Sequence, residues 1–147
     1  MRIIQISRFI AIVMSGLGLA NCQTALDTGG PSAATAVEPV FLRRAANPGE
    51  IYLTASASGV LSLKNGCFKM GNASIVWPSN AQLERDPQGR IAILNKVTGK
   101  TVRIGARIAM GGGEVDRFEP AVLEQGPSQL EQCPGPYFLA DDNFRPG

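Results

Sequence analysis

The sequence predicts an all-β fold in which about six short strands form a small OB-like barrel, closed or partly closed. From residue 51 onward, short apolar segments alternate with polar positions at a period of two residues. Gly, Pro and Asn turn signals separate these segments at intervals of roughly 8 to 12 residues, which is typical of sandwiches and barrels. Closure of the sheet also removes free edges, which a small domain would otherwise expose.

The first expected strand covers residues 60–64, where Leu61 and Leu63 share one face. Asn65-Gly66 then forms a favoured two-residue hairpin turn, because both residues readily adopt positive φ. The returning strand is expected at residues 67–70. The remaining strands are expected at residues 74–77, 90–94, 101–104, 107–110 and 137–140.

Two local signals fall between these strands. The run 86–89 places Asp, Pro and Gly at positions suited to a type I turn. Ser128 and Glu131 have capping-box spacing, but the prolines on either side confine a helix there to one or two turns.

The chain divides into four expected parts: a signal peptide at residues 1–21, a flexible tether at 22–50, the β-barrel domain at 51–141 and a C-terminal tail at 142–147. The tether is rich in Gly, Pro and Ala and has no sustained periodicity. Its Val-Phe-Leu run at 40–42 is apolar enough to dock on the domain. Arg43-Arg44, which follows, is expected to be a solvated pair of linker charges.

The N-terminus has the features of an export signal. Two basic residues, Arg2 and Arg8, precede an apolar run from Phe9 to Ala20 that ends in small residues. A membrane span needs about 20 apolar residues. The run is too short for a permanent span, so it is expected to be removed after export.

The residues Leu19-Ala20-Asn21-Cys22 resemble the lipobox of bacterial lipoproteins, although Asn21 departs from the small residue usual before the cysteine. The resemblance implies that Cys22 is acylated and that this lipid anchor holds the protein to a membrane. Gln23 after the cysteine favours the outer membrane, or its periplasmic face, in an envelope with two membranes. Cleavage after Ala20, which would give a soluble secreted or periplasmic protein, is the alternative.

Charge and composition narrow the possible functions. Lys and Arg total 14 and Asp and Glu total 12, so removal of Arg2 and Arg8 leaves 14 − 2 = 12 basic against 12 acidic residues. This balance does not favour a nucleic-acid partner. The absence of histidine removes the commonest general base and a common metal ligand. We therefore expect a protein that is not an enzyme and has no cofactor or metal.

Cys67 and Cys133 form a pair within the domain once Cys22 is assigned to the anchor. Two cysteines in an exported domain favour a disulfide. Such a bond would stabilise the folded domain by roughly 4 kcal/mol, because it lowers the entropy of the unfolded chain. The alternatives are a Cys67 nucleophile or a metal-binding pair. Both lack a histidine or further thiolates to activate or complete them.

Gly111, Gly112, Gly113 and Glu114 form the most conspicuous motif. Consecutive glycines can form an anion-binding nest, although a bulge and turn at the barrel rim is the favoured interpretation. Trp77 is a second candidate, because an exposed indole can stack on a sugar ring. Packing of Trp77 in the core is favoured over stacking.

Two hypotheses based on carboxylates are less favoured. Glu114, Asp116 and Glu119 do not have the spacing of an EF-hand calcium site, so a solvated acidic loop is expected. A glycosidase would need two carboxylates converging in one cleft, and no pattern in the sequence indicates such a pair.

Four motifs together resemble those of a group of small bacterial envelope proteins. They are Asn-Gly-Cys at 65–67, Trp-Pro at 77–78, Gly-Gly-Gly-Glu at 111–114 and Cys-Pro-Gly-Pro-Tyr at 133–137. The resemblance covers residues 59–140. It implies a compact exported β-domain with a cysteine pair and no catalytic residues.

We therefore expect a non-enzymatic, lipid-anchored envelope protein that binds a protein or cell-wall partner, or has a structural role. Binding is expected at a loop rim around residues 78–89 and 111–119. The alternative is a small-ligand or oligosaccharide-binding domain that uses Trp77 and the Gly111–Glu114 rim. The exposure of Trp77 distinguishes the two, because a buried Trp77 favours partner binding or a structural role.

Overall fold

The structure, a computed structural model, describes residues 38–46 and 53–147. The predicted signal peptide at 1–21, the predicted lipidation site Cys22 and most of the predicted tether lie outside the described residues. Within them nearly all of the regular secondary structure is β, as the sequence predicts. No helix in this part of the chain is long and apolar enough to cross a membrane.

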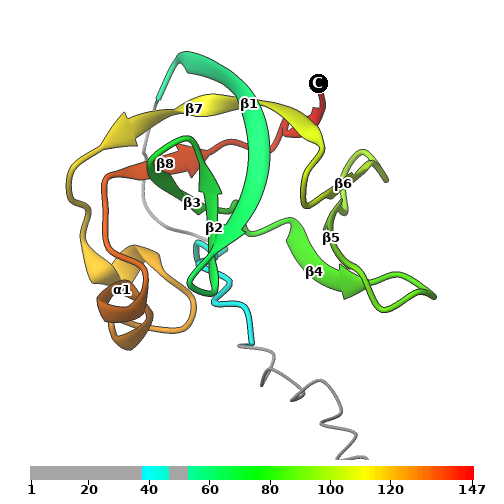
Figure 1. Cartoon of the computed structure of the whole chain (residues 1–147). Helices are drawn as coiled ribbons and strands as arrows, with labels where there is room; N and C mark the ends of the chain where they lie inside the picture. The colour runs from blue at the N-terminus through cyan, green and yellow to red at the C-terminus, as the bar shows by residue number, and fades with distance from the viewer. Residues whose placement is uncertain (1–37, 47–52) are drawn as a thin grey trace, which may run out of the picture. The chain divides into compact units, whose positions relative to one another are not determined.

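Five strands form the barrel (Figure 1). They are β1 (Ala55–Lys64), β2 (Cys67–Met70), β3 (Ala73–Val76), β7 (Arg107–Val115) and β8 (Tyr137–Ala140). The sheet order is β1-β2-β3-β8-β7, and β1 pairs with β7 to bring the two ends of the sheet together. The β3–β8 pair is parallel and the other pairs are antiparallel. A five-stranded, partly closed barrel is the architecture of the OB fold, so the predicted fold class is confirmed.

A second sheet is inserted between β3 and β7. It consists of β4 (Ala81–Arg85), β5 (Ile91–Asn95) and β6 (Thr101–Arg103), in that spatial order. Ala81, Ile93 and Val102 pack from this sheet into the same core as the barrel strands. The sequence analysis did not predict β4, because Leu83 is the one large apolar residue in this segment and marks the alternation only weakly.

The remaining elements are short. They are the 3-10 helix η1 (Pro120–Val122), the helix α1 (Ser128–Gln132) and the strand β9 (Arg145–Pro146). Helix α1 has the predicted length of one to two turns. Its N-cap residue is Pro127, with no side-chain hydrogen bond at the cap, so Ser128 lies inside the helix and does not form the predicted capping box.

The main core fills the barrel and contains an aromatic cluster. Trp77 contacts Phe41, Phe68 and Phe144, with ring centroids 5.9, 6.1 and 5.2 Å apart. A second apolar cluster, which includes Leu42, Val76 and both cysteines of the pair, covers the other side of β3 and β8. Both strands are therefore buried on both faces, which explains their continuous runs of buried residues.

Strands β1 and β7 are longer than the sequence predicts, at 10 and 9 residues. The additional residues, Ala55–Gly59 and Gly111–Val115, pair in regular register. Most of these residues are Ala, Ser or Gly. Such small side chains do not produce the hydrophobic alternation on which strand prediction depends.

Both predicted domain boundaries also shift. Residues 142–147, expected to be a tail, belong to the domain, because β9 pairs with β7 and Phe144 is fully buried. At the other end, the predicted docking of residues 40–42 is present. Phe41 enters the main core, and Val40 forms a parallel bridge with Cys67. These contacts add both terminal segments to the folded domain.

Arg43 and Arg44 are not the solvated charges that the sequence favours. Arg43 forms an ion pair with Glu124 and donates a hydrogen bond to the carbonyl oxygen of Ala81. Arg44 donates from Nη2 to the carbonyl oxygen of Ala140 at 2.7 Å. Both arginines therefore attach the segment 38–46 to the domain.

Candidate functional site

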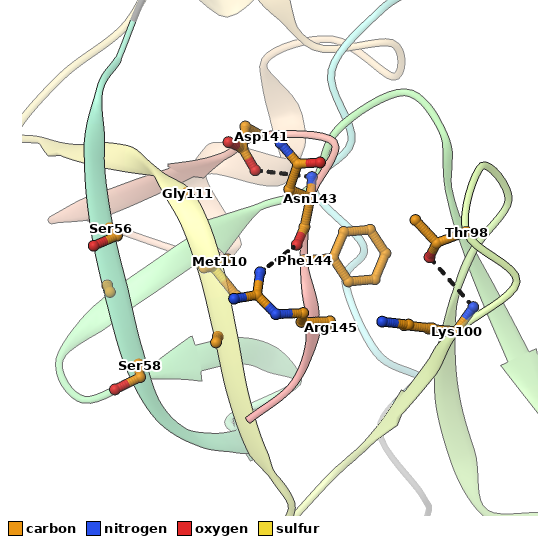
Figure 2. A pocket seen from close by; sticks show the side chains of 12 residues that line it. Ser56, Ser58, Thr98, Lys100, Met110, Gly111, Asp141, Asn143, Phe144 and Arg145 are labelled. Atoms are coloured by element: carbon orange, nitrogen blue, oxygen red, sulfur yellow. Dashed lines mark hydrogen bonds between the residues drawn. The ribbon is translucent and has the colours of Figure 1, made fainter.

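A polar cleft of about 590 Å³ lies beside the barrel strands β1 and β7. Its other walls come from the turn between β5 and β6 and from the segment that joins β8 to β9 (Figure 2). The residues that line it are Ser56, Ala57, Ser58, Thr98, Lys100, Ala109, Met110, Gly111, Asp141, Asn143, Phe144 and Arg145. The sequence did not predict this cleft, since its walls come from four separate parts of the chain.

The strand register places small residues on one face of the sheet, and these form the floor of the cleft. Ser58 lies opposite Ala109 on β7, and Ala109 lies opposite Arg145 on β9. Directly opposed residues in an antiparallel sheet present their side chains on the same face. In the next row Ser56 lies opposite Gly111. Small side chains therefore form the floor of the cleft, and the serine hydroxyl groups lie along the β1 side.

At Gly111 the Asp141 carboxylate occupies the space that a side chain would take, so a larger residue there would displace this carboxylate. A Cβ atom on Gly111 would come within 2.1 Å of Asp141 Oδ2. The other carboxylate oxygen of Asp141, Oδ1, accepts a hydrogen bond of 2.9 Å from the backbone N–H of Asn143. Asp141 is thus fixed at one end of the cleft, over β7.

At Gly112 and Gly113, other local contacts explain why the residue is glycine. Gly112 has φ of +134°, and a Cβ there would come within 1.9 Å of the carbonyl oxygen of Leu139. Gly113 packs against the side chain of Leu53. The motif Gly111–Glu114 is therefore part of β7, and not the rim turn or anion-binding nest considered from the sequence. Glu114 is exposed and does not line the cleft.

Two cations border the cleft. Figure 2 shows Lys100 extending from the β5–β6 turn toward Arg145, and Arg145 lying across β7. Within the described part of the chain, neither side chain has a carboxylate oxygen within the 4.0 Å of an ion pair. Arg145 donates one long hydrogen bond, 3.4 Å, to the carbonyl oxygen of Asn143. Both cations are exposed and available to an anion.

Asn95 fixes two walls of the cleft relative to each other. This fully buried side chain accepts hydrogen bonds at Oδ1 from the backbone N–H groups of Val97 and Thr98, at 3.0 and 3.1 Å. Its Nδ2 donates to the carbonyl oxygens of Asp142 and Phe144, at 2.8 and 3.1 Å. One amide therefore holds the β5–β6 turn against the β8–β9 segment. The sequence suggested a loop near Thr98 but gave no signal for the long-range pair of bonds.

Trp77 does not lie at a rim or in a groove, because it is 0 % exposed and belongs to the main core. It cannot stack on a ligand from this position. Of the residues considered from the sequence as a ligand rim, Gly111 is the one that lines the cleft. The loop at 86–89 forms the predicted turn, with a hydrogen bond of 2.8 Å from the Gly89 N–H to the Asp86 carbonyl oxygen.

The Asp86 carboxylate lies in the turn between β4 and β5 and accepts several hydrogen bonds. Burial alone would raise the pKa of Asp86. Hydrogen bonds from the backbone and guanidinium of Arg90 and from the backbone of Gln88 outweigh this effect, so the pKa lies below its usual value. Asp86 stabilises its own turn and does not line the cleft.

A smaller cavity of about 150 Å³ is lined by Arg44, Ala45, Ala46, Ser79 and Asp142. Burial lowers the pKa of Arg44, while Asp142 and Asp141 act in the opposite direction. Asp142 therefore already supplies this guanidinium with a counter-charge. The cavity leaves less room and less free positive charge for an external anion than the larger cleft does.

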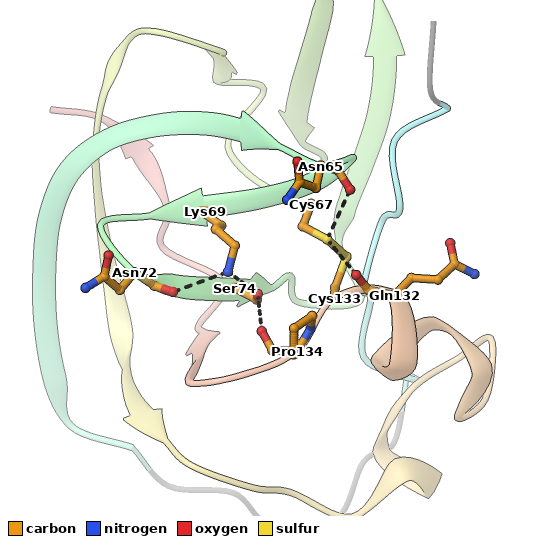
Figure 3. The surroundings of a disulfide bond; sticks show 8 residues. All are labelled: Asn65, Cys67, Lys69, Asn72, Ser74, Gln132, Cys133 and Pro134. Atoms are coloured by element: carbon orange, nitrogen blue, oxygen red, sulfur yellow. Dashed lines mark hydrogen bonds between the residues drawn. A yellow bond between two sulfur atoms is a disulfide. The ribbon is translucent and has the colours of Figure 1, made fainter. Parts of the chain in front are cut away.

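Cys67 and Cys133 form the predicted disulfide (Figure 3). It joins the start of β2 to the end of α1, and its Cα atoms are 5.6 Å apart. Next to it, the buried Ser74 hydroxyl donates to the carbonyl oxygen of Pro134 at 2.8 Å. These two links hold the segment before β8 against the outside of the barrel.

No group of three His, Cys, Asp or Glu side chains in the described ranges gathers closely enough to hold a metal ion. Glu114, Asp116 and Glu119, which the sequence brings close together, form no such group.

Comparison with protein-family models, curated proteins and solved structures finds no match for this chain. Its fold and geometry define the class: an OB-like β-barrel domain with an inserted three-stranded sheet and a polar cleft bordered by cations.

Proposed function

We propose that the protein is an exported, lipid-anchored domain of the cell envelope that binds a protein or cell-wall partner and catalyses no reaction. The export signal and the lipobox-like residues before Cys22 support the location and the membrane anchor. The Cys67–Cys133 disulfide also supports an oxidising compartment, because such bonds persist outside the cytosol.

The observation that carries the binding proposal is the preorganised cleft. Asn95 fixes its walls, and Lys100 and Arg145 present uncompensated charge beside it. A site whose walls are fixed before binding loses less conformational entropy when a partner arrives. The runner-up, a small-ligand site formed by Trp77 and the Gly111–Glu114 rim, loses support because Trp77 is buried.

The anchor is tested by the intact mass of the protein purified from membranes of its native host, before and after reduction. We expect a chain that begins at acylated Cys22 and gains the mass of two hydrogens when the disulfide is reduced. A chain without acyl groups that begins at Asn21 would overturn the anchor and favour a soluble secreted protein.

Binding is tested in the same host with a photo-crosslinking amino acid at Thr98, which lines the cleft, and at Gln88, which is exposed on the β4–β5 turn. We expect a cross-linked product from position 98 and none from position 88. Products from both positions, or from neither, would contradict a partner bound at the cleft.

A further inference from the structure

The face that contains the cleft carries more positive than negative charge. Arg107 precedes Ala109 on β7 by two residues, so its side chain lies on the same face as Arg145. Arg107, Lys100 and Arg145 form no ion pair with any described carboxylate. Among the residues that line the cleft, Lys100 and Arg145 carry two positive charges and Asp141 carries one negative charge. This local excess contrasts with the balanced charge of the mature chain and suits an anionic ligand.

The rest of the cleft offers hydrogen-bonding groups suited to a ligand rich in hydroxyls. The Ser56 and Ser58 hydroxyls can donate and accept. Asp141 Oδ1 is used by Asn143, but Oδ2 has no hydrogen bond within the described residues and can accept one from a ligand hydroxyl. The cleft volume of about 590 Å³ lies within the range of ligand sites, roughly 300 to 1,000 Å³.

Two other classes of anionic polymer fit the cleft less well. Nucleic-acid bases need exposed aromatic rings on which to stack, and the one aromatic residue here, Phe144, is 0 % exposed. A peptide needs an apolar pocket for an anchoring side chain. Met110 and Phe144, the large apolar residues of the lining, are buried, so the exposed side chains of the cleft are polar or charged.

We propose that this cleft binds an anionic oligosaccharide or polyol, whose carboxylate or phosphate contacts Lys100 and Arg145 while its hydroxyls contact Ser56, Ser58 and Asp141. The proposal rests on the proposed function and names the chemical class of the cell-wall partner. Charge-assisted hydrogen bonds from the two cations would supply most of the affinity. The serine and aspartate contacts would distinguish a hydroxyl-bearing polymer from a simple anion.

Calorimetric titration of the mature protein tests this with three oligomers of equal length. A galacturonate hexamer presents carboxylates, a glycerol phosphate hexamer presents phosphates, and maltohexaose presents hydroxyls without charge. We expect binding of at least one anionic hexamer and no measurable binding of maltohexaose. The anionic hexamer that binds more tightly identifies the charged group. Equal binding of all three, or of none, would overturn the proposal.

Matched charge-reversal variants locate the site. The double variant Lys100→Glu, Arg145→Glu should weaken binding of the anionic hexamer by about tenfold or more. The control Lys64→Glu, Arg117→Glu makes the same change in net charge at exposed residues that lie outside the walls of the cleft. It should weaken binding by about twofold at most, since long-range charge effects are screened by salt. Equal losses in the two double variants would place binding elsewhere and overturn the proposal.

The cell cross-link separates the two proposals. A product at Thr98 that is degraded by proteinase alone would identify a protein partner, overturning the glycan inference while the proposed function stands. The absence of any product at Thr98 would instead contradict the proposed function itself.

Discussion

At the scale of single residues, Asn95 shows how one side chain can organise a site without contacting its ligand. Its amide connects backbone groups of the β5–β6 turn with those of the β8–β9 segment. The side chain is fully buried, and its bond to the Phe144 carbonyl oxygen is buried too, so loss of this bond leaves a polar group without water. Asn95 is therefore a positioning residue for the walls of the cleft.

Replacement of this amide should be costly. We expect Asn95→Ala to lower the free energy of unfolding by about 3 kcal/mol, because it removes hydrogen bonds to four backbone groups, among them the buried carbonyl of Phe144. The amide protons of Val97 and Thr98, which donate to Oδ1, should also exchange faster with solvent. Denaturant unfolding and hydrogen exchange measure the two effects. Lys96→Ala, an exposed neighbour, is the control, and a similar small change in both variants would contradict the assigned role.

At the scale of elements, prediction from sequence succeeded where side chains were large and alternating. The strand predicted at residues 107–110 is the first half of β7, where Ile108 and Met110 are buried. The second half consists mainly of glycines, whose role becomes clear once β8 and Asp141 lie against them. Close approach between segments far apart in the sequence leaves no periodic signal. The same reason explains why the cleft could not be predicted, although Gly111 was considered for binding.

The segment 38–46 is an element that the sequence assigned to the tether and the structure assigns to the domain. Its Phe41 ring packs on Phe68 and Trp77. We expect Phe41→Ala to lower the free energy of unfolding by about 3 kcal/mol, through lost burial and the cavity that remains. Thermal and urea unfolding of the protein measure this loss.

Glu38→Gln is the matched control for this segment, since it removes only the exposed contact of 3.6 Å with Arg85. Such a surface ion pair contributes about 1 kcal/mol at most. If the two variants had equal stability, the segment would be a docked part of the tether and not a structural part of the barrel.

At the scale of the whole molecule, two separate apolar clusters stabilise the domain. The barrel and the inserted sheet share one apolar core, whereas the segment before β8 packs on the outside over a second cluster. Figure 1 shows α1 and the inserted sheet on opposite sides of the barrel. The disulfide lies on the α1 side, and the cleft is formed with the inserted sheet. Stability of the outer cluster and geometry of the cleft should therefore be separable.

Removal of the disulfide tests this separation. The bond closes a loop with a sequence separation of 66 residues, and loop-closure entropy assigns it about 4 kcal/mol. We expect Cys67→Ala, Cys133→Ala to lose about that much stability in urea unfolding, with faster hydrogen exchange at residues 116–136. Hydrogen exchange at the amide protons of Val97 and Thr98 should speed up no more than the loss in global stability requires, because Asn95 still holds the β5–β6 turn. Equal loss of protection at both places would show that the disulfide also supports the cleft, and that the molecule behaves as a single cooperative unit.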